Sequence, residues 1–118
     1  MDPFPEKPRR LLVFAPAAED ARLLRQRELL SGAAEGLSDR DLRVEYLTGD
    51  RAAPARREYG VAADVFAALL VGRDGGVKRR YPELVASDEL FGHVDEMPLR
   101  RREMREAEEG REGRGEGP

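Results

Sequence analysis

The chain has no cysteine, and this absence excludes much of the chemistry that proteins carry out with sulfur. Disulfide bonds, thiolate nucleophiles and zinc sites with sulfur ligands all need cysteine. The absence does not indicate a cellular compartment, because a chain without cysteine is equally at home in reducing and oxidising surroundings. The protein must therefore act without cysteine redox chemistry.

Long hydrophobic runs and an excess of positive charge are also missing. No stretch approaches the ~20 apolar residues of a membrane helix, so we expect no membrane partner. Lysine and arginine number 21 against 24 acidic residues, which leaves a net charge of -3. Nucleic-acid binding needs a basic face, so we expect no nucleic-acid partner. The 118 residues, 40% of them hydrophobic, suffice for one domain with a modest core, which we expect to be a monomer.

Two short segments are continuously apolar and two others are charged. Residues 11–15 and 66–71 predict buried strands, whereas residues 41–48 and 77–81 predict strands at a sheet edge or with one wet face. Residues 73–76, Arg-Asp-Gly-Gly, predict a hairpin turn, because glycine adopts the positive φ that such a turn demands. We therefore expect a four-stranded sheet with the apolar strands in the centre.

Helices are predicted between and after these strands. Beyond Ala18, apolar side chains recur on one helical face, and Gly32 or Gly36 is expected to end that helix; the face is formed by Leu23, Leu30, Ala34 and Leu37. A short helix is expected around residues 55–59. A last helix begins with Ser87 as its cap, and Pro98 should kink or interrupt it.

Composition divides the chain into four parts. Residues 1–9 contain three prolines and should form an extended N-terminal arm, and residues 10–98 should form the domain. Residues 99–109 are expected to be a charged helical extension. Residues 110–118 are expected to be a disordered tail, because they have too little apolar surface to offset the entropy of ordering.

Several segments carry a resemblance to a bacterial family. LLVFAP at residues 11–16, GRDGGVK at 72–78 and DEMPLRRREM at 95–104 are matched in order, together with Asp20, Gln26, Arg40, Asp41, Gly49 and Asp50. In these segments the chain resembles domain of unknown function 4174, a family regarded as thioredoxin-like and related to repeats in some animal extracellular-matrix proteins. The resemblance implies an α/β, thioredoxin-like fold: a four-stranded mixed sheet with helices on both faces. No activity is established for the family, so the resemblance implies no catalytic residue.

In thioredoxin-like proteins the working residues lie just after the first strand, at the start of the first helix. Here that position holds residues 16–20, Pro-Ala-Ala-Glu-Asp, so the resemblance implies a scaffold without a redox mechanism. Glu19 and Asp20 either cap the first helical turn or form a carboxylate pair for acid–base work. The lone His93 is either a partly exposed helical histidine or a further acid–base group, and it has too few neighbouring ligands for a metal site.

The segment MPLRRREMR, residues 97–105, contains the other candidate contacts, Arg100 and Arg101. These arginines either stay solvated along a helix or bind an anion or an acidic partner. If they instead meet an acid of this chain, three carboxylates are best placed in the sequence: Asp41, Asp50 and Asp95.

Together these features favour a non-catalytic binding or interaction module, with an unidentified protein or a small anionic ligand as its partner. The alternatives are a cysteine-independent enzyme that uses Glu19, Asp20 or His93, and an anion- or carboxylate-binding protein that uses Arg100 and Arg101. We expect no cofactor and no metal. The sequence as it stands is expected in the cytoplasm, whereas a leader missing from this start would indicate a periplasmic or secreted protein.

We predict that the purified protein neither reduces the disulfides of insulin nor decomposes peroxide, because both reactions need a cysteine thiolate. Insulin turbidity and peroxide consumption are the measurements. Turnover of either substrate by the pure chain, above that of a heat-denatured sample, would contradict the prediction.

Overall fold

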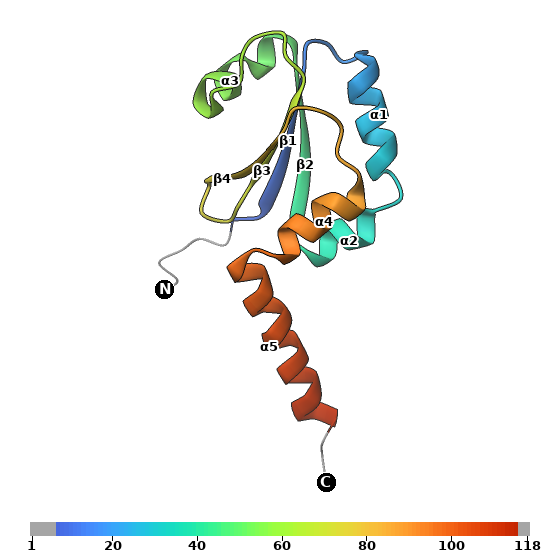
Figure 1. Ribbon diagram of the computed structural model, residues 1–118, viewed down its shortest axis with the longest axis vertical. Coiled ribbons are helices and arrows are strands. Elements are labelled where there is room, and N and C mark those ends of the chain that lie inside the picture. The colour runs from blue at the N-terminus through green and yellow to red at the C-terminus, as the bar shows by residue number, and fades with distance from the viewer. Residues whose placement is uncertain (1–6, 116–118) are drawn as a thin grey trace. The chain divides into compact units, whose positions relative to one another are not determined.

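Four strands form one mixed sheet in the first of the two units into which the chain divides, residues 1–87 and 88–118 (Figure 1). A computed structural model of the chain describes residues 7–115, with side chains described as far as Gly110. The strands lie in the order β2-β1-β3-β4, and β1 is parallel to β2 and antiparallel to β3, which is antiparallel to β4. Their bounds are β1 (Arg9–Ala15), β2 (Leu42–Thr48), β3 (Ala67–Val71) and β4 (Val77–Tyr81). The predicted sheet, with apolar strands in the centre and charged strands at the edges, is confirmed.

The first strand begins at Arg9, two residues earlier than its apolar run predicts. Arg9 is only 1% exposed, its backbone N–H donates to the carbonyl of Asp41 at 2.9 Å, and its Nη1 donates to the carbonyl of Arg40 at 2.9 Å. The arm expected over residues 1–9 therefore overlaps β1, and its residues 1–6 lie outside the described part of the chain. Hydropathy alone did not indicate this start, because an arginine is buried only where carbonyl or carboxylate oxygens accept hydrogen bonds from it.

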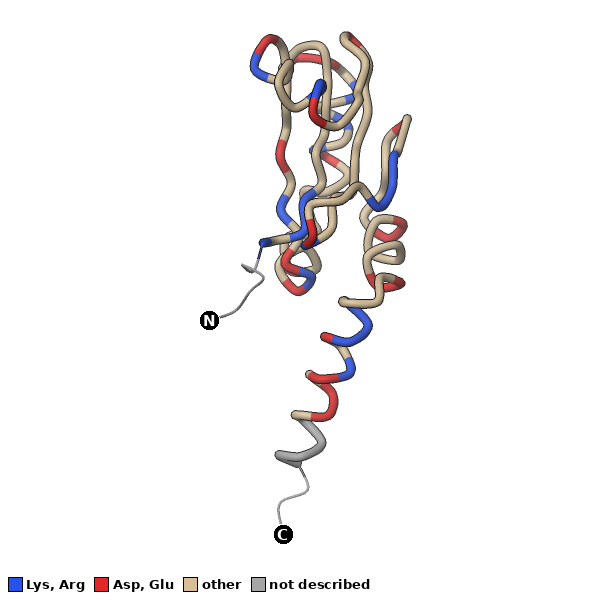
Figure 2. The backbone as a smooth tube through the Cα atoms, turned by 90° about the vertical axis from the view of Figure 1, so that its left-hand side faces the viewer, with Lys and Arg blue, Asp and Glu red and all other residues tan. Residues whose placement is uncertain are grey.

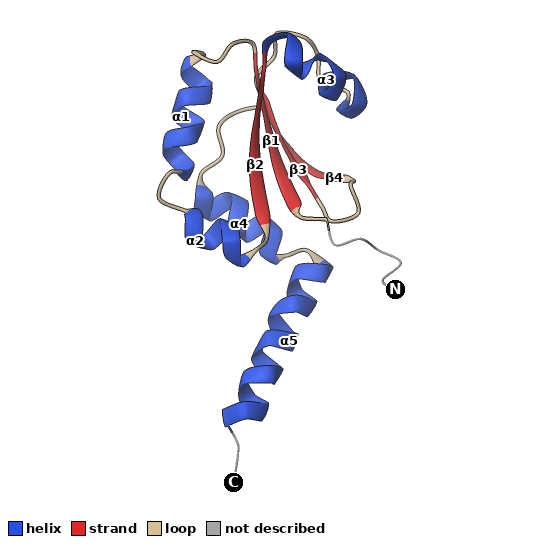
Figure 3. Ribbon diagram, turned by 180° about the vertical axis from the view of Figure 1, so that it is seen from behind, coloured by secondary structure: helices blue, strands red, loops and turns tan. Residues whose placement is uncertain are grey.

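Alternation along β1 sends side chains to two faces of the sheet, and a helix covers each face (Figures 1 and 3). On one face, α3 (Ala53–Tyr59) covers a buried cluster made of Leu12, Phe14, Ala52, Val61, Leu69 and Val71. On the other face, α1 (Ala21–Leu30) places Arg27 over the ring of Tyr46, which is paired in register with Val13. Helices on both faces, as the sequence predicts, are confirmed.

The single helix predicted after residue 18 is instead two helices, α1 and α2 (Ala34–Asp39). The hydroxyl and the backbone N–H of Ser31 both donate to the carbonyl of Glu28, which terminates α1 before Gly32. The expectation of one continuous apolar face was therefore wrong at its second half, since Ala34 and Leu37 belong to α2. A glycine next to a capping serine favours such a break.

Turns and short helices follow the glycine pattern. The segment after β2 forms a 3-10 turn, η1 (Gly49–Ala52), and then α3, which ends at Gly60 in the left-handed region with a φ of 68°. Between β3 and β4, the N–H of Gly72 donates to the carbonyl of Gly76 at 2.9 Å, and Gly75 has a φ of 83°. Both the short helix and the glycine hairpin are predicted features that the structure contains.

The second unit contains most of α4 (Ser87–Asp95) and all of α5 (Pro98–Gly115). Pro98 occupies the first position of α5, where its missing N–H costs nothing, so the predicted interruption is confirmed. The boundary expected at Gly110 falls within α5, and residues 116–118 of the expected tail lie outside the described residues. No helix in the described part of the chain is long and apolar enough to cross a membrane.

The first two turns of α5 contain three arginines, Arg100, Arg101 and Arg102, whose charge opposes the helix dipole (Figure 2). Cations near a helix N-terminus are unfavourable. A side-chain pair partly offsets this, because Arg102 Nε lies 3.0 Å from Glu106 Oε1 at a spacing of four residues. The two side chains are well exposed, so the pair contributes only a few tenths of a kcal/mol, roughly.

A buried amide holds the segment that follows β4 in the first unit. Gln26 of α1 is 0% exposed, and its Nε2 donates to the carbonyl of Val85 at 2.8 Å while its Oε1 accepts from the Val85 N–H at 2.9 Å. Val85 is itself 0% exposed. The side chain therefore pairs with both backbone groups of Val85 as a neighbouring strand would.

We predict that Gln26→Leu lowers the free energy of unfolding by about 3 kcal/mol, because it leaves the buried N–H and carbonyl of Val85 without partners at ~1–3 kcal/mol each. Urea unfolding is the measurement. The control is Arg25→Ala, which removes only the exposed Arg25–Glu28 ion pair and should change stability by less than about 0.5 kcal/mol. If Gln26→Leu and Arg25→Ala are equally stable, the hydrogen bonds between Gln26 and Val85 do not stabilise the fold as proposed.

Candidate functional site

The parallel strands β1 and β2 have their C-terminal ends at the same side of the sheet. This is the edge at which the resemblance to thioredoxin-like proteins places the working residues. Residues 16–20 follow β1, and Gly49 follows β2. The N–H of Gly49 donates to the carbonyl of Pro16 at 3.2 Å, so the two loops are joined. Gly49 has a φ of 59°, a conformation that an L side chain strains to adopt. Ligands of open α/β sheets bind at such an edge, which makes it the first place to search for a site.

Asp20 caps α1 at this edge. Its Oδ1 accepts from the backbone N–H of Arg22 at 2.9 Å, and the guanidinium of Arg22 contacts both carboxylate oxygens, with Nη2 3.1 Å from Oδ2 and Nε 3.2 Å from Oδ1. The hydrogen bond from the Arg22 side chain lowers the pKa of Asp20 below its ordinary value of 3.8. Asp20 is therefore an ionised carboxylate at neutral pH whose oxygens already have partners.

Glu19 and His93 are the other acid–base candidates. Glu19 is exposed, and its side chain makes no hydrogen bond or ion pair within the described residues, so it does not form a carboxylate pair with Asp20 there. His93 is half-buried on α4 and belongs to the second unit, whereas Glu19 and Asp20 belong to the first. Among the described residues, no group of three or more histidine or acidic side chains is arranged to hold a metal ion.

Arg22 also joins this edge to the segment before β3. Its guanidinium carbon lies 5.4 Å from the centre of the Phe66 ring, and Phe66 is 2% exposed. The preceding Val65 is 44% exposed. The start of α1 and the loop that precedes β3 are thus neighbours at the same edge.

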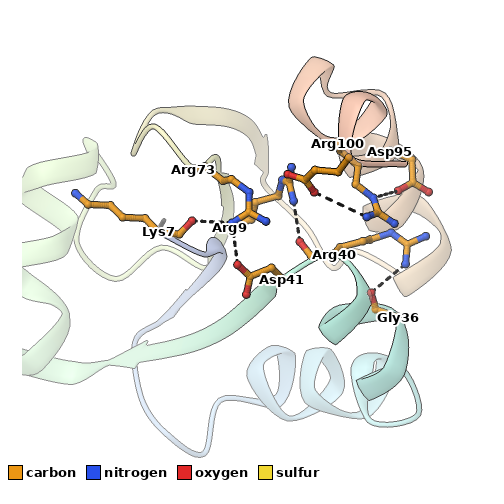
Figure 4. Close-up of polar contacts among 9 residues, drawn as sticks. Lys7, Arg9, Gly36, Arg40, Asp41, Arg73, Asp95 and Arg100 are labelled. Atoms are coloured by element: carbon orange, nitrogen blue, oxygen red, sulfur yellow. Dashed lines mark hydrogen bonds and ion pairs between the residues drawn. The ribbon is translucent and has the colours of Figure 1, made fainter. Parts of the chain in front are cut away.

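Arg100 and Arg101 occupy different surroundings although they are adjacent. The side chain of Arg100 is only 10% exposed, and its Nε lies 3.2 Å from Asp95 Oδ1, with Nη1 3.9 Å from Glu103 Oε1 (Figure 4). Arg101 is exposed. Consecutive residues point about 100° apart on a helix, which separates the two. Of the three internal acids that the sequence suggests as partners, Asp95 is the one that binds Arg100, and this pair spans the junction of α4 and α5.

An ion pair that the sequence did not indicate joins the hairpin turn to the start of β2. Arg73 Nη1 lies 2.8 Å from Asp41 Oδ2 and also donates to the carbonyl of Lys7 at 3.0 Å (Figure 4). Arg40 beside it donates to the carbonyl of Gly36 at 3.0 Å. The residues of the Arg73–Asp41 pair are 32 positions apart, so no local pattern indicates their contact.

We predict that Arg100→Ala lowers the free energy of unfolding by about 1.5–3 kcal/mol, because it removes the partly buried contact between Arg100 Nε and Asp95 Oδ1. Arg101→Ala is the matched control and should change stability by less than about 0.5 kcal/mol. Both values come from urea unfolding of the full chain. If the two alanine variants are equally stable, the Asp95 contact is not a structural clamp.

Several solved structures share the fold. The reduced 2-Cys peroxiredoxin of Plasmodium vivax matches with a TM-score of 0.60 and 18% identity over 78% of each chain. A structure described as that of a malarial protein matches with a TM-score of 0.60 and 15% identity over 75% of this chain and 96% of that one. The alkylhydroperoxide reductase AhpF of Enterococcus faecalis, as its C503A mutant, matches with a TM-score of 0.52 and 23% identity over 75% of this chain, which spans only 41% of that protein.

At these identities the matches show a thioredoxin-like fold and nothing about activity. No curated protein matches the sequence. The family model described as Domain of unknown function (DUF4174) matches residues 1–103, which is most of the chain. The segments that carry the resemblance and the thioredoxin-like sheet agree with this match, and the chain belongs to the DUF4174 family.

Proposed function

We propose that the protein is a non-catalytic binding module on a thioredoxin-like scaffold. The proposal rests on the structural role of the residues that follow β1. There the carboxylate of Asp20 caps α1 and binds Arg22, and no cysteine is present. A carboxylate with a lowered pKa and occupied oxygens is a poor general acid or base near neutral pH, because catalysis favours a pKa close to the working pH.

The residues that carry the family resemblance support the same proposal, because most of their polar groups make structural contacts. Gln26 binds Val85, and Asp41 binds Arg73. Asp74 binds Lys78 at 2.8 Å and accepts from the N–H of Gly76 at 2.9 Å, which closes the hairpin. What these residues have in common is a role in holding the sheet and its turns together, as expected of a scaffold.

The proposed binding face is the exposed edge beside the start of α1. Glu19, Asp50, Asp64 and Val65 are all exposed there, on loops that the Pro16–Gly49 and Arg22–Phe66 contacts bring together. An apolar side chain among acids and the exposed Arg22 and Arg51 fits a protein segment or a small molecule with apolar and charged parts. In the alternative in which Arg100 and Arg101 bind an anion, Arg101 is the arginine that is exposed on α5.

Two variants with matched exposure test the binding face. Val65→Asp changes the proposed face, whereas Leu24→Asp changes a 52% exposed apolar residue on α1 and serves as its control. We expect ligands or proteins enriched by the native chain to be lost with Val65→Asp and retained with Leu24→Asp, at unchanged melting temperatures. Quantitative mass spectrometry of the bound fraction is the measurement. Enrichment that is insensitive to Val65→Asp would contradict the proposed face.

The enzyme alternative predicts turnover. A metabolite extract incubated with the protein should then lose a compound in amounts far above the protein's own, and Glu19→Gln or His93→Gln should abolish that loss. A binding module instead retains a compound at no more than stoichiometric amount and consumes none. Turnover that is abolished by either variant would replace this proposal with the enzyme.

A further inference from the structure

Arg56 of α3 is a buried cation in the first unit. The residue is 8% exposed, and its guanidinium carbon lies 5.3 Å from the centre of the Phe14 ring. Its Nη1 donates to the carbonyl of Ala62. Phe14 belongs to the cluster that α3 covers, so the arginine stem lies against the core while its head is held between a ring and a carbonyl.

No acidic side chain neutralises this guanidinium within the described part of the chain. The acids nearest to it in sequence, Glu58, Asp50 and Asp64, are exposed and form no ion pair with it there. Arg100, which is equally buried, differs in having the carboxylate of Asp95 as a counter-ion. A buried cation without a counter-ion is unfavourable, because a ring and one carbonyl replace only part of its hydration.

The remaining donors of Arg56 reach the surface. Every fully buried side-chain nitrogen among the described residues has a hydrogen-bond partner, and the one partner of Arg56 there is the Ala62 carbonyl at Nη1. Nε and Nη2 therefore retain contact with solvent. The neighbouring Ala62 and Ala63 are exposed and carry only methyl side chains, which leaves the loop beside the guanidinium free of bulky groups.

We propose that Arg56 is the anchor of a binding site for a small oxyanion, a carboxylate or a phosphate, which accepts hydrogen bonds from Nε and Nη2. The guanidinium is planar, and its stacking on Phe14 and its bond to Ala62 fix its orientation before a ligand arrives. Binding such an anion supplies the counter-ion that none of the described residues provides at this position. The site shares the loop between α3 and β3 with Asp64 and Val65 of the binding face proposed above, but it depends on a different residue, Arg56, so either proposal stands if the other fails.

If Arg56 has only a structural role, the expected response to anions is different. If Arg56 only packs its stem and extends its head to water, anions should act on it no more than on any exposed cation. Arg57 is such a cation, adjacent in sequence and exposed. It provides a matched control with the same change in net charge on the same helix.

The test is the melting temperature of the full chain while chloride is replaced by inorganic phosphate, or separately by acetate, at constant ionic strength. We expect a saturable rise of about 3 °C or more for the native chain with at least one of the two anions. Arg56→Met should abolish the saturable rise. Arg57→Met should keep it, with a half-saturating concentration within about twofold of the native value.

Arg56→Lys keeps the charge and removes the planar pair of donors, so we expect its half-saturating concentration to rise at least about tenfold. If Arg56→Met does not fold, the half-saturating concentration of Arg56→Lys tests the proposal in its place. The proposal is overturned if the native chain shows no saturable rise. It is also overturned if all variants rise in parallel, which indicates a general salt effect, or if Arg57→Met weakens the response as much as Arg56→Lys.

Discussion

The position of β1 between β2 and β3 is the constraint on which the rest of the fold depends. Because β1 is paired on both edges, its side chains point only to the two faces, and residues 11–15 are at most 1% exposed. Both faces must then be covered, which α1 does on one side and α3 on the other (Figures 1 and 3). The unpaired edges fall to β2 and β4, whose exposed Arg43, Glu45 and residues 78–80 discourage pairing with another chain.

Arginine side chains stabilise this small core by stacking on aromatic rings, a contact to which the planar guanidinium is better suited than the ammonium group of lysine. Among the described residues of the first unit, guanidinium groups lie over aromatic rings in the pairs Arg22–Phe66, Arg27–Tyr46 and Arg56–Phe14. A planar, weakly hydrated cation packs against a ring and still donates hydrogen bonds sideways. This allows a chain with only 6% aromatic residues to extend its apolar contacts with charged side chains.

The thioredoxin-like scaffold and its usual chemistry are separable in this protein. The fold is similar to that of a 2-Cys peroxiredoxin, yet the segment after β1 carries a capped helix start and no thiol. The polar residues shared with the family mostly make hydrogen bonds within the chain, as the Asp41–Arg73 and Gln26–Val85 contacts show. Both proposed sites therefore use exposed or incompletely neutralised groups, Val65 in one and Arg56 in the other.

The sequence by itself determined the strands, their order in the sheet, the hairpin and the interruption at Pro98, because these follow from apolar runs, glycine and proline. It also suggested Asp95 as a partner of Arg100, a contact between residues only five positions apart. Only the tertiary structure decided the burial of Arg9 and Arg56 and the Asp41–Arg73 pair. The physical reason is that a long cationic side chain is accommodated by rings, carbonyls and carboxylates from distant segments, which no local pattern of hydropathy records.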